Sequence, residues 1–221
     1  MKAERVFDTL AERYDKWYDE PFGKSAFNLE RACIASLCGN STPNILEIGV
    51  GTGRFAEALK IEYGVDVSTS VLRFAKRRKI NVVKGIGEKL PFPDKFFEAV
   101  FIIVTLCFVD EPTKVLEEAS RVLKDNGGII LGLILKESLW ASFYEKKGGT
   151  GNVFYRIARF YSFGELKAMI EKSELKIIEV SSTIFQAPTE KLLRPEYPRK
   201  GYDEKAGFVA MKLAKANFSV Y

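Results

Sequence analysis

Short apolar runs alternate with helix-like apolar stripes along most of this chain. The stretch from Asn44 to Gly53 reads NILEIGVGTG, and its apolar residues cluster tightly between Pro43 and the first glycine. Such a run, bounded by turn residues, is typical of a strand buried on both faces. Phe55, Ala58 and Leu59 follow at helical spacing. The stretch therefore predicts a strand, a glycine-rich turn and a helix.

The same alternation continues to the end of the chain. Helical spacing covers residues 4–19, Pro21 and Gly23 are expected to break that helix, and a second helix should end at Gly39-Asn40. Further strands are predicted at 63–65, 81–84, 99–104, 176–185 and 207–213. Gly127-Gly128 should form a turn before a strand that follows it, and Ser162 to Glu165 reads as a capping box. Because no helix separates the last two strands, they should pair antiparallel if adjacent.

Composition narrows the chemistry available to the protein. The 221 residues contain no histidine, which removes the commonest general base, triad partner and zinc ligand. We therefore exclude Ser-His-Asp hydrolases and most zinc enzymes, and expect no metal site. A net charge of +5, spread along the chain, fits a solvated basic surface better than a nucleic-acid groove.

Other features predict a soluble cytoplasmic protein. The longest apolar run, Ala99 to Val109, is too short to span a membrane. The charged N-terminus has no apolar core, so we expect no signal peptide. Three cysteines, an odd number, argue against a disulfide framework and for a reducing compartment.

Two acidic residues make the glycine-rich turn a candidate ligand site. Glu47 lies within an apolar strand, where an unpaired carboxylate is costly, so it should face a polar cleft. Asp66 ends the next strand, 19 residues later, where a carboxylate can accept hydrogen bonds from ribose hydroxyls. Gly49, Gly51 and Gly53 allow a sharp turn and a close approach by a ligand. Glycines alone can also serve only a tight turn.

The glycine spacing E-x-G-x-G-x-G differs from the dinucleotide pattern G-x-G-x-x-G and resembles motif I of the class I S-adenosylmethionine-dependent methyltransferases. Three other stretches are similar to that family: Ala11-x-x-Tyr14-Asp15 near the N-terminus, Glu88-x-Leu90-Pro91-Phe92, and the RVLKDNGG run at 121–128. The chain departs from the family at Ile86, where an aspartate usually contacts adenine, and at 106–108, where a histidine is common.

The resemblance implies the fold, the cofactor and its contacts. The fold should be α/β and Rossmann-like, a doubly wound, mainly parallel seven-stranded sheet with one antiparallel strand and an N-terminal helical cap. The cofactor should be S-adenosylmethionine. Its expected contacts are Tyr14, Glu47, Gly49, Val50, Gly51, Gly53, Asp66, Val67, Gly87, Glu88 and Val104. Because Ile86 replaces the aspartate, adenine recognition should rely on backbone and stacking contacts.

We expect a single domain in four parts: the cap (1–40), a cofactor-binding core (41–135), a helical and aromatic lid after the fifth strand (136–161), and a C-terminal helix and strand pair (162–221). The lid segment is rich in aromatic residues. It either packs as an inserted helix on the sheet edge or forms the acceptor pocket, since specificity commonly resides on loops at this edge. In the second interpretation the acceptor contacts are Trp140, Tyr144, Phe154 and Tyr155.

The predicted function is methyl transfer from S-adenosylmethionine to a small organic acceptor, aromatic or amphipathic, with neither nucleic acid nor membrane as partner. The sequence identifies no general base or other catalytic residue, and it leaves the oligomeric state open. Two alternatives remain: an NAD(P)-dependent oxidoreductase on a related sheet, which the glycine spacing disfavours, and a non-catalytic S-adenosylmethionine-binding protein.

Overall fold

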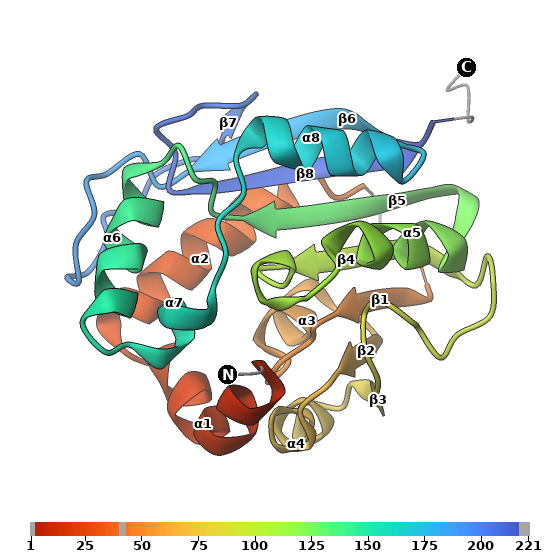
Figure 1. The fold of residues 1–221 in the computed structure, drawn as a ribbon, viewed down its shortest axis with the longest axis horizontal. Helices are drawn as coiled ribbons and strands as arrows, with labels where there is room; N and C mark the ends of the chain where they lie inside the picture. The colour runs from red at the N-terminus through yellow and green to blue at the C-terminus, as the bar shows by residue number, and fades with distance from the viewer. Residues whose placement is uncertain (1–2, 40–42, 217–221) are drawn as a thin grey trace.

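The protein is built around one mixed β-sheet with helices on both faces (Figure 1). The computed structural model describes residues 3–39 and 43–216. Eight strands lie in the order β3-β2-β1-β4-β5-β8-β6-β7. They are β1 (Ile45–Ile48), β2 (Tyr63–Asp66), β3 (Asn81–Lys84), β4 (Phe97–Ile103), β5 (Leu123–Leu133), β6 (Leu175–Thr183), β7 (Arg199–Lys200) and β8 (Phe208–Lys215).

Helices join and cover these strands. They are α1 (Ala3–Trp17), α2 (Pro21–Ala35), α3 (Arg54–Leu59), α4 (Thr69–Arg77), the 3₁₀ turn η1 (Leu106–Phe108), α5 (Pro112–Val122), α6 (Leu139–Gly149), α7 (Val153–Ile157) and α8 (Phe163–Lys172). The side chain of Ser162 and that of Glu165 form the predicted capping box at the start of α8. In Figure 1 the parallel strands point toward the side of the molecule where α1, α6 and α7 lie.

The predicted fold class is confirmed. Strands β1 to β5 are parallel, and β8 pairs antiparallel with both β5 and β6. The strand order reverses at β1, where β2 and β4 are its neighbours, and ligands of open α/β sheets bind at such a point. One strand was not predicted: β7 has two residues and lies at the sheet edge, in the connection between β6 and β8.

The break predicted after the first helix is present, because α1 ends at Trp17 and α2 begins at Pro21, although Gly23 lies inside α2 rather than in the break. Pro21 is the first residue of α2. Proline is favoured there since the first helical N–H has no partner in any case. Another local prediction is wrong. Gly127-Gly128 lies within β5 rather than in a turn before it, where the register with β4 jumps. Helix α2 ends at Ala35, and Asn40 lies outside the described residues.

Alternation along the strands divides the core between the two sheet faces. Leu46, Ile48 and Ile102 pack with α5 and α8 on one face. Ile45 and Ile103 pack with α2, α3 and α4 on the other face. Glu47, one residue after Leu46, therefore points to the α2 side, because successive strand side chains alternate.

The aromatic segment 136–161 forms α6 and α7, and part of it is core. Trp140 is only 2% exposed, and its ring lies parallel to that of Phe22 on α2 with centroids 5.9 Å apart. Its indole N–H donates a hydrogen bond to the Gln186 carbonyl oxygen at 2.9 Å. A buried indole with its polar atom satisfied is typical of structural packing.

Helix α1 is tied to the loops that follow β1 and β2. Arg54 binds both carboxylate oxygens of Asp15 at 2.9 Å, and Arg78 binds the same carboxylate at 3.1 Å. Seven residues nearer the N-terminus, Asp8 accepts hydrogen bonds from the Ser68 hydroxyl at 2.6 Å and the Ser70 N–H at 3.1 Å. The cap is therefore fixed to the core by charge-assisted contacts.

We predict that Asp15→Asn destabilises the protein at neutral pH. Burial alone raises the pKa of the Asp15 carboxyl, but hydrogen bonds from Arg54 and Arg78 outweigh burial and hold the pKa below 3.8. The stabilisation is therefore present above pH 3.8 and is lost as the pH falls below it. Because the Asp15 side chain is 13% exposed, we expect a loss of about 2 kcal/mol, between the values for surface and buried pairs.

Denaturant unfolding at pH 7 measures this loss. Asp19→Asn is the matched control, because Asp19 also binds Arg54 but its side chain is 66% exposed. We expect less than about 1 kcal/mol for that variant. Equal losses for the two variants would contradict a special role for the Asp15 contacts.

Candidate functional site

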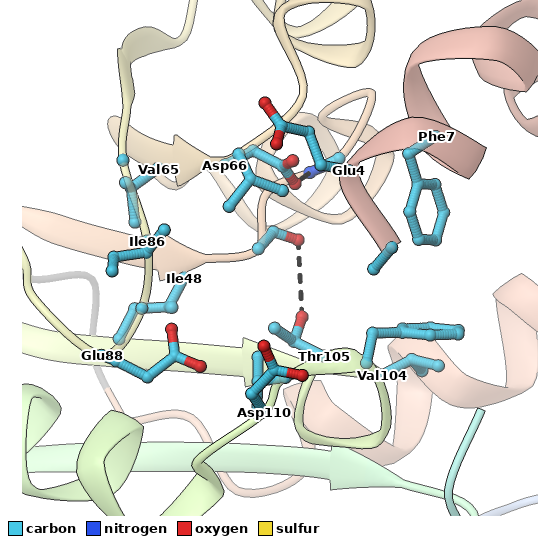
Figure 2. A pocket seen from close by; sticks show the side chains of 18 of the residues that line it. Glu4, Phe7, Ile48, Val65, Asp66, Ile86, Glu88, Val104, Thr105 and Asp110 are labelled. Carbon is cyan, nitrogen blue, oxygen red and sulfur yellow. Dashed lines mark hydrogen bonds between the residues drawn. The ribbon is translucent and has the colours of Figure 1, made fainter. Parts of the chain in front are cut away.

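A cavity of about 240 Å³ opens at the carboxyl edge of the parallel strands, beside α1 (Figure 2). Its walls are the β1–α3 loop, the ends of β2 and β4, the chain after β3 and the N-terminal part of α1. It lies at β1, the point where the strand order of the sheet reverses. Eight of the predicted cofactor contacts line it: Tyr14, Gly49, Gly51, Asp66, Val67, Gly87, Glu88 and Val104.

Three predicted contacts do not line this cavity. Glu47 and Val50 line a smaller neighbouring cavity of about 20 Å³, which shares Tyr14, Gly49 and Val104 with the larger one. Gly53 lines neither, and a Cβ there would lie 2.5 Å from Ile80 Cδ1. Glycine is required at position 53 because the turn packs closely against the chain after α4.

Gly51 is the glycine that faces the cavity. Its φ is +53°, in the left-handed region, and a Cβ would have only the Tyr14 ring 3.6 Å away and the Gly49 carbonyl oxygen at 4.0 Å. At Gly49, by contrast, a Cβ would lie 2.3 Å from Thr105 Oγ1. A ligand can therefore approach Gly51 from the side that a Cβ would occupy, whereas at Gly49 that side is blocked by Thr105.

Asp66 is held in place by the backbone. Its Oδ2 accepts a hydrogen bond from Gly51 N–H at 2.9 Å, and its Oδ1 accepts one from Ser68 N–H at 2.9 Å. Burial raises the pKa of this carboxyl, although both backbone bonds act to lower it. A carboxylate has about four acceptor positions, so roughly two remain for a ligand.

Glu47 is 2% exposed, and its Oε2 atom has no hydrogen-bond partner in the described part of the chain. Burial, and secondarily the charge of Asp66, holds the pKa of Glu47 well above 4.5. A buried carboxyl oxygen without a partner is costly and is rare in folded proteins. This atom is therefore a candidate acceptor for a ligand group that donates hydrogen bonds.

Val104 carries backbone strain at the end of β4. Its φ is +47°, in a region that β-branched residues avoid, and its N–H donates to the Gly132 carbonyl oxygen at 2.7 Å. Such strain costs about 1–3 kcal/mol and clusters at functional sites. The sequence gives no sign of this conformation.

The cavity is acidic. Four carboxylates line it, from Glu4, Asp66, Glu88 and Asp110, and no Lys or Arg is among its described lining residues, although Lys84 pairs with Glu4 at 3.1 Å. Figure 2 shows these side chains around the opening. The electrostatics therefore favour a cationic ligand over one that carries phosphates.

Several lining residues were missed by the sequence analysis. Glu4 and Phe7 come from α1, and Phe108 and Asp110 come from the loop after β4. A signal exists for Phe7, which lies seven residues before Tyr14 and therefore on the same face of a helix. The loop residues follow a predicted strand end, but sequence spacing cannot tell which of them turn inward.

The four predicted acceptor residues lie outside the lining of the larger cavity. Trp140 and Tyr144 are buried in the core. Phe154 lies nearest the cavity, with its ring centroid 5.4 Å from that of Phe7 and 5.7 Å from that of Tyr14. The Tyr155 ring stacks on Tyr144 at 4.3 Å and also lines a surface hollow.

Within residues 3–39 and 43–216, no group of three or more cysteine, aspartate or glutamate side chains is placed to hold a metal ion. The same residues contain no helix that could span a membrane.

Comparison with known proteins identifies the family. Residues 46–131 match the family model described as a methyltransferase domain. A crystal structure from Thermotoga maritima, titled as an S-adenosylmethionine-dependent methyltransferase and possible histamine N-methyltransferase, is 35% identical with a TM-score of 0.87. That match covers 96% of this chain and 99% of the other.

Two sequence relatives extend the comparison. An uncharacterized protein of Methanocaldococcus jannaschii is 40% identical over 95% of this chain and 98% of its own length. A demethylmenaquinone methyltransferase of Renibacterium salmoninarum is 30% identical over 57% of this chain and 56% of its own. The predicted cofactor is therefore confirmed, and the chain belongs to the class I S-adenosylmethionine-dependent methyltransferases.

Proposed function

We propose that this protein transfers a methyl group from S-adenosylmethionine to a small organic acceptor. The acidic cavity at the carboxyl edge of β1, β2 and β4 is the observation that carries this proposal. The cofactor brings a sulfonium and an ammonium group, which suit a site with four carboxylates and no described Lys or Arg. NAD(P) brings a pyrophosphate, which the same site would repel.

Three groups of the chain can hold the cofactor. The Asp66 carboxylate would accept hydrogen bonds from the ribose hydroxyls through its remaining acceptor positions. The partnerless Oε2 of Glu47 would accept one from the ammonium group, through the small cavity that adjoins the larger one. Gly51 leaves room for the ligand to pass close to the backbone.

The adenine end would be bound without an acidic side chain. Ile86 is 48% exposed and lines the cavity next to Gly87 and Glu88. An isoleucine can pack against the face of adenine but cannot bind its amino group, so backbone groups would supply the hydrogen bonds.

The proposed acceptor is a small molecule that enters from the side of α6 and α7. The names of the two methyltransferase relatives support this class, since histamine and demethylmenaquinone are both small organic compounds. The aromatic contacts of Phe154 with Phe7 and Tyr14 connect α7 to the cavity wall. Positioning of the acceptor against the methyl group can supply most of the rate.

The cofactor assignment is tested by ligand-induced stabilisation. At about 100 times its dissociation constant, S-adenosylhomocysteine should raise the Tm by about 5 °C or more. NAD and NADP at the same concentration should leave the Tm unchanged. Stabilisation by NAD but not by S-adenosylhomocysteine would overturn the proposed function.

We predict that Asp66→Ala weakens binding of S-adenosylhomocysteine by about 1–3 kcal/mol, the cost of losing charge-assisted hydrogen bonds. Calorimetry measures the change. Asp125→Ala is the control, because Asp125 pairs with Lys95 near the start of β5, at the opposite edge of the sheet. Unchanged affinity in Asp66→Ala would show that the ribose binds elsewhere.

Gly51→Ala should cost both stability and cofactor affinity. An alanine at φ +53° is strained by about 1–2 kcal/mol, and its Cβ would occupy space at the cavity. Gly39→Ala is the matched control, since a Cβ there meets nothing within 4 Å. Thermal unfolding and calorimetry should show lower stability and weaker cofactor binding for Gly51→Ala than for Gly39→Ala. Similar values for the two variants would contradict this explanation of Gly51.

A further inference from the structure

One buried serine joins the cofactor site to the N-terminal cap. Ser68 lies between β2 and α4 and binds two carboxylates from different parts of the molecule. Its N–H donates a hydrogen bond to Asp66 Oδ1 at 2.9 Å, and its hydroxyl donates one to Asp8 Oδ1 on α1 at 2.6 Å. Ser68 is 0% exposed, so both bonds lie away from water, where they are stronger. The cap and the carboxylate expected to bind ribose are therefore connected through one residue.

The orientation of Asp66 depends on the position of Ser68. The Asp66 carboxylate accepts one hydrogen bond from Gly51 N–H and one from Ser68 N–H, on different oxygens. No side chain in the described part of the chain donates to it. A shift of the Ser68 backbone would therefore turn or release the carboxylate, and its free acceptor positions would no longer face the cavity in the same way.

Asp8 holds Ser68 and the start of α4 from across the helix interface. The same Oδ1 atom accepts a second hydrogen bond, from Ser70 N–H at 3.1 Å. The Ser68 hydroxyl accepts in turn from Val71 N–H at 3.3 Å, as the N-cap of α4. The hydrogen bonds from Ser68 and Ser70 hold the pKa of Asp8 below 3.8, so Asp8 is a charged acceptor at neutral pH and its bonds are strong.

The other polar contacts of α1 do not fix the Asp8 end of the helix. Leu10 has a φ of −118° and a ψ of 19°, outside the helical region, and this kink lies between Asp8 and Asp15. The ion pairs of Asp15 therefore do not dictate where Asp8 lies. Before the kink, Glu4 pairs with Lys84, but these side chains are 45% and 55% exposed, and exposed pairs contribute little. Asp8 is thus the main polar anchor of the first part of α1.

The part of α1 that Asp8 anchors also forms a wall of the cavity. Glu4 and Phe7 line the cavity, and Figure 2 shows both side chains there. The Phe7 ring lies 5.2 Å from that of Phe108 and 5.4 Å from that of Phe154, measured between centroids. Because Phe7 directly precedes Asp8, loss of the Asp8 contacts would disturb this wall as well as the cofactor carboxylate.

We propose that Asp8 is a positioning residue for the cofactor: through Ser68 it holds Asp66 in the orientation that receives the ribose, so that attachment of the cap and binding of the cofactor stabilise each other. This inference rests on the proposed function. Asp8 does not itself line the cavity, so it acts only through other residues. Because such coupling is reciprocal, the bound cofactor strengthens the cap contacts by the same factor by which the cap contacts strengthen cofactor binding.

Calorimetric titration with S-adenosylhomocysteine tests this coupling. Asp8→Ala should weaken binding about fivefold to twentyfold, because Ser68 is no longer held from the cap. Asp8→Asn should stay within about twofold of the unmodified protein, because the amide oxygen can accept both hydrogen bonds at the Oδ1 position. Glu12→Ala is the matched control, since it removes an exposed carboxylate from the same helix and should leave the affinity unchanged.

A double-mutant cycle separates positioning from structural support. In protein that already carries Asp66→Ala, the further change Asp8→Ala should alter the affinity by less than about twofold, because the group through which Asp8 acts is absent. Losses that simply add would show that Asp8 acts independently of Asp66 and would overturn the inference. So would an Asp8→Ala variant with lower stability and unchanged affinity, since Asp8 would then serve only to cap α4.

Hydrogen exchange provides a second measurement that needs no substitution at Asp8. The Ser70 N–H is bonded to Asp8, so it reports on the cap contact. Saturating S-adenosylhomocysteine should slow its exchange about fivefold or more, relative to amides of β8, in the unmodified protein but not in Asp66→Ala. Equal slowing in the two proteins, or none in either, would overturn the inference. Failure to bind S-adenosylhomocysteine at all would instead overturn the proposed function.

Discussion

The ionic attachment of α1 is the constraint on which the rest of the site depends. Asp15 and Asp8 fix one helix to Arg54, Arg78 and Ser68, all of which lie in or beside the turns after β1 and β2. The same helix presents Phe7 and Tyr14 to the cavity. The turns that hold Gly51 and Asp66 are therefore also the turns that hold the cap, and a ligand bound by one set of residues is enclosed by the other.

Two buried carboxyl groups, those of Glu47 and Glu30, add to the negative charge of the acidic cavity lining. Glu47 has an oxygen without a partner, and Glu30 has neither an ion pair nor a hydrogen bond from any described residue. Both lower the stability of the protein without ligand, since burial opposes their ionised forms. Under the proposed function, the ammonium group of the cofactor would offset this cost at Glu47, and binding would then be coupled to folding through that group.

The sequence predicts site residues best where they lie within a short stretch of chain. Gly51 and Asp66 are recognisable because strand, turn and helix follow one another within a few residues, and the structure brings both to one cavity. Trp140 shows the opposite case. Helical spacing says that an aromatic residue has a buried side, but only the packing of α6 on α2 decides that this side is core. The burial of Glu30 was missed for the same reason, because only the packing of α2 decides which of its residues are buried. The strain at Val104 depends on the register of β4 with β5 and has no local signal at all.

Because the chain has no histidine, few of its groups can titrate near neutral pH, and the buried carboxyl of Glu30 is one of them. Side chains with ordinary pKa values leave the charge of a histidine-free chain nearly constant between about pH 6 and 7. Any proton exchanged in that interval reports on a group whose surroundings have displaced its titration. Calorimetric heats of ligand binding, measured in buffers of different ionisation enthalpy, would therefore count the protons bound or released by the buried carboxyls Glu30 and Glu47.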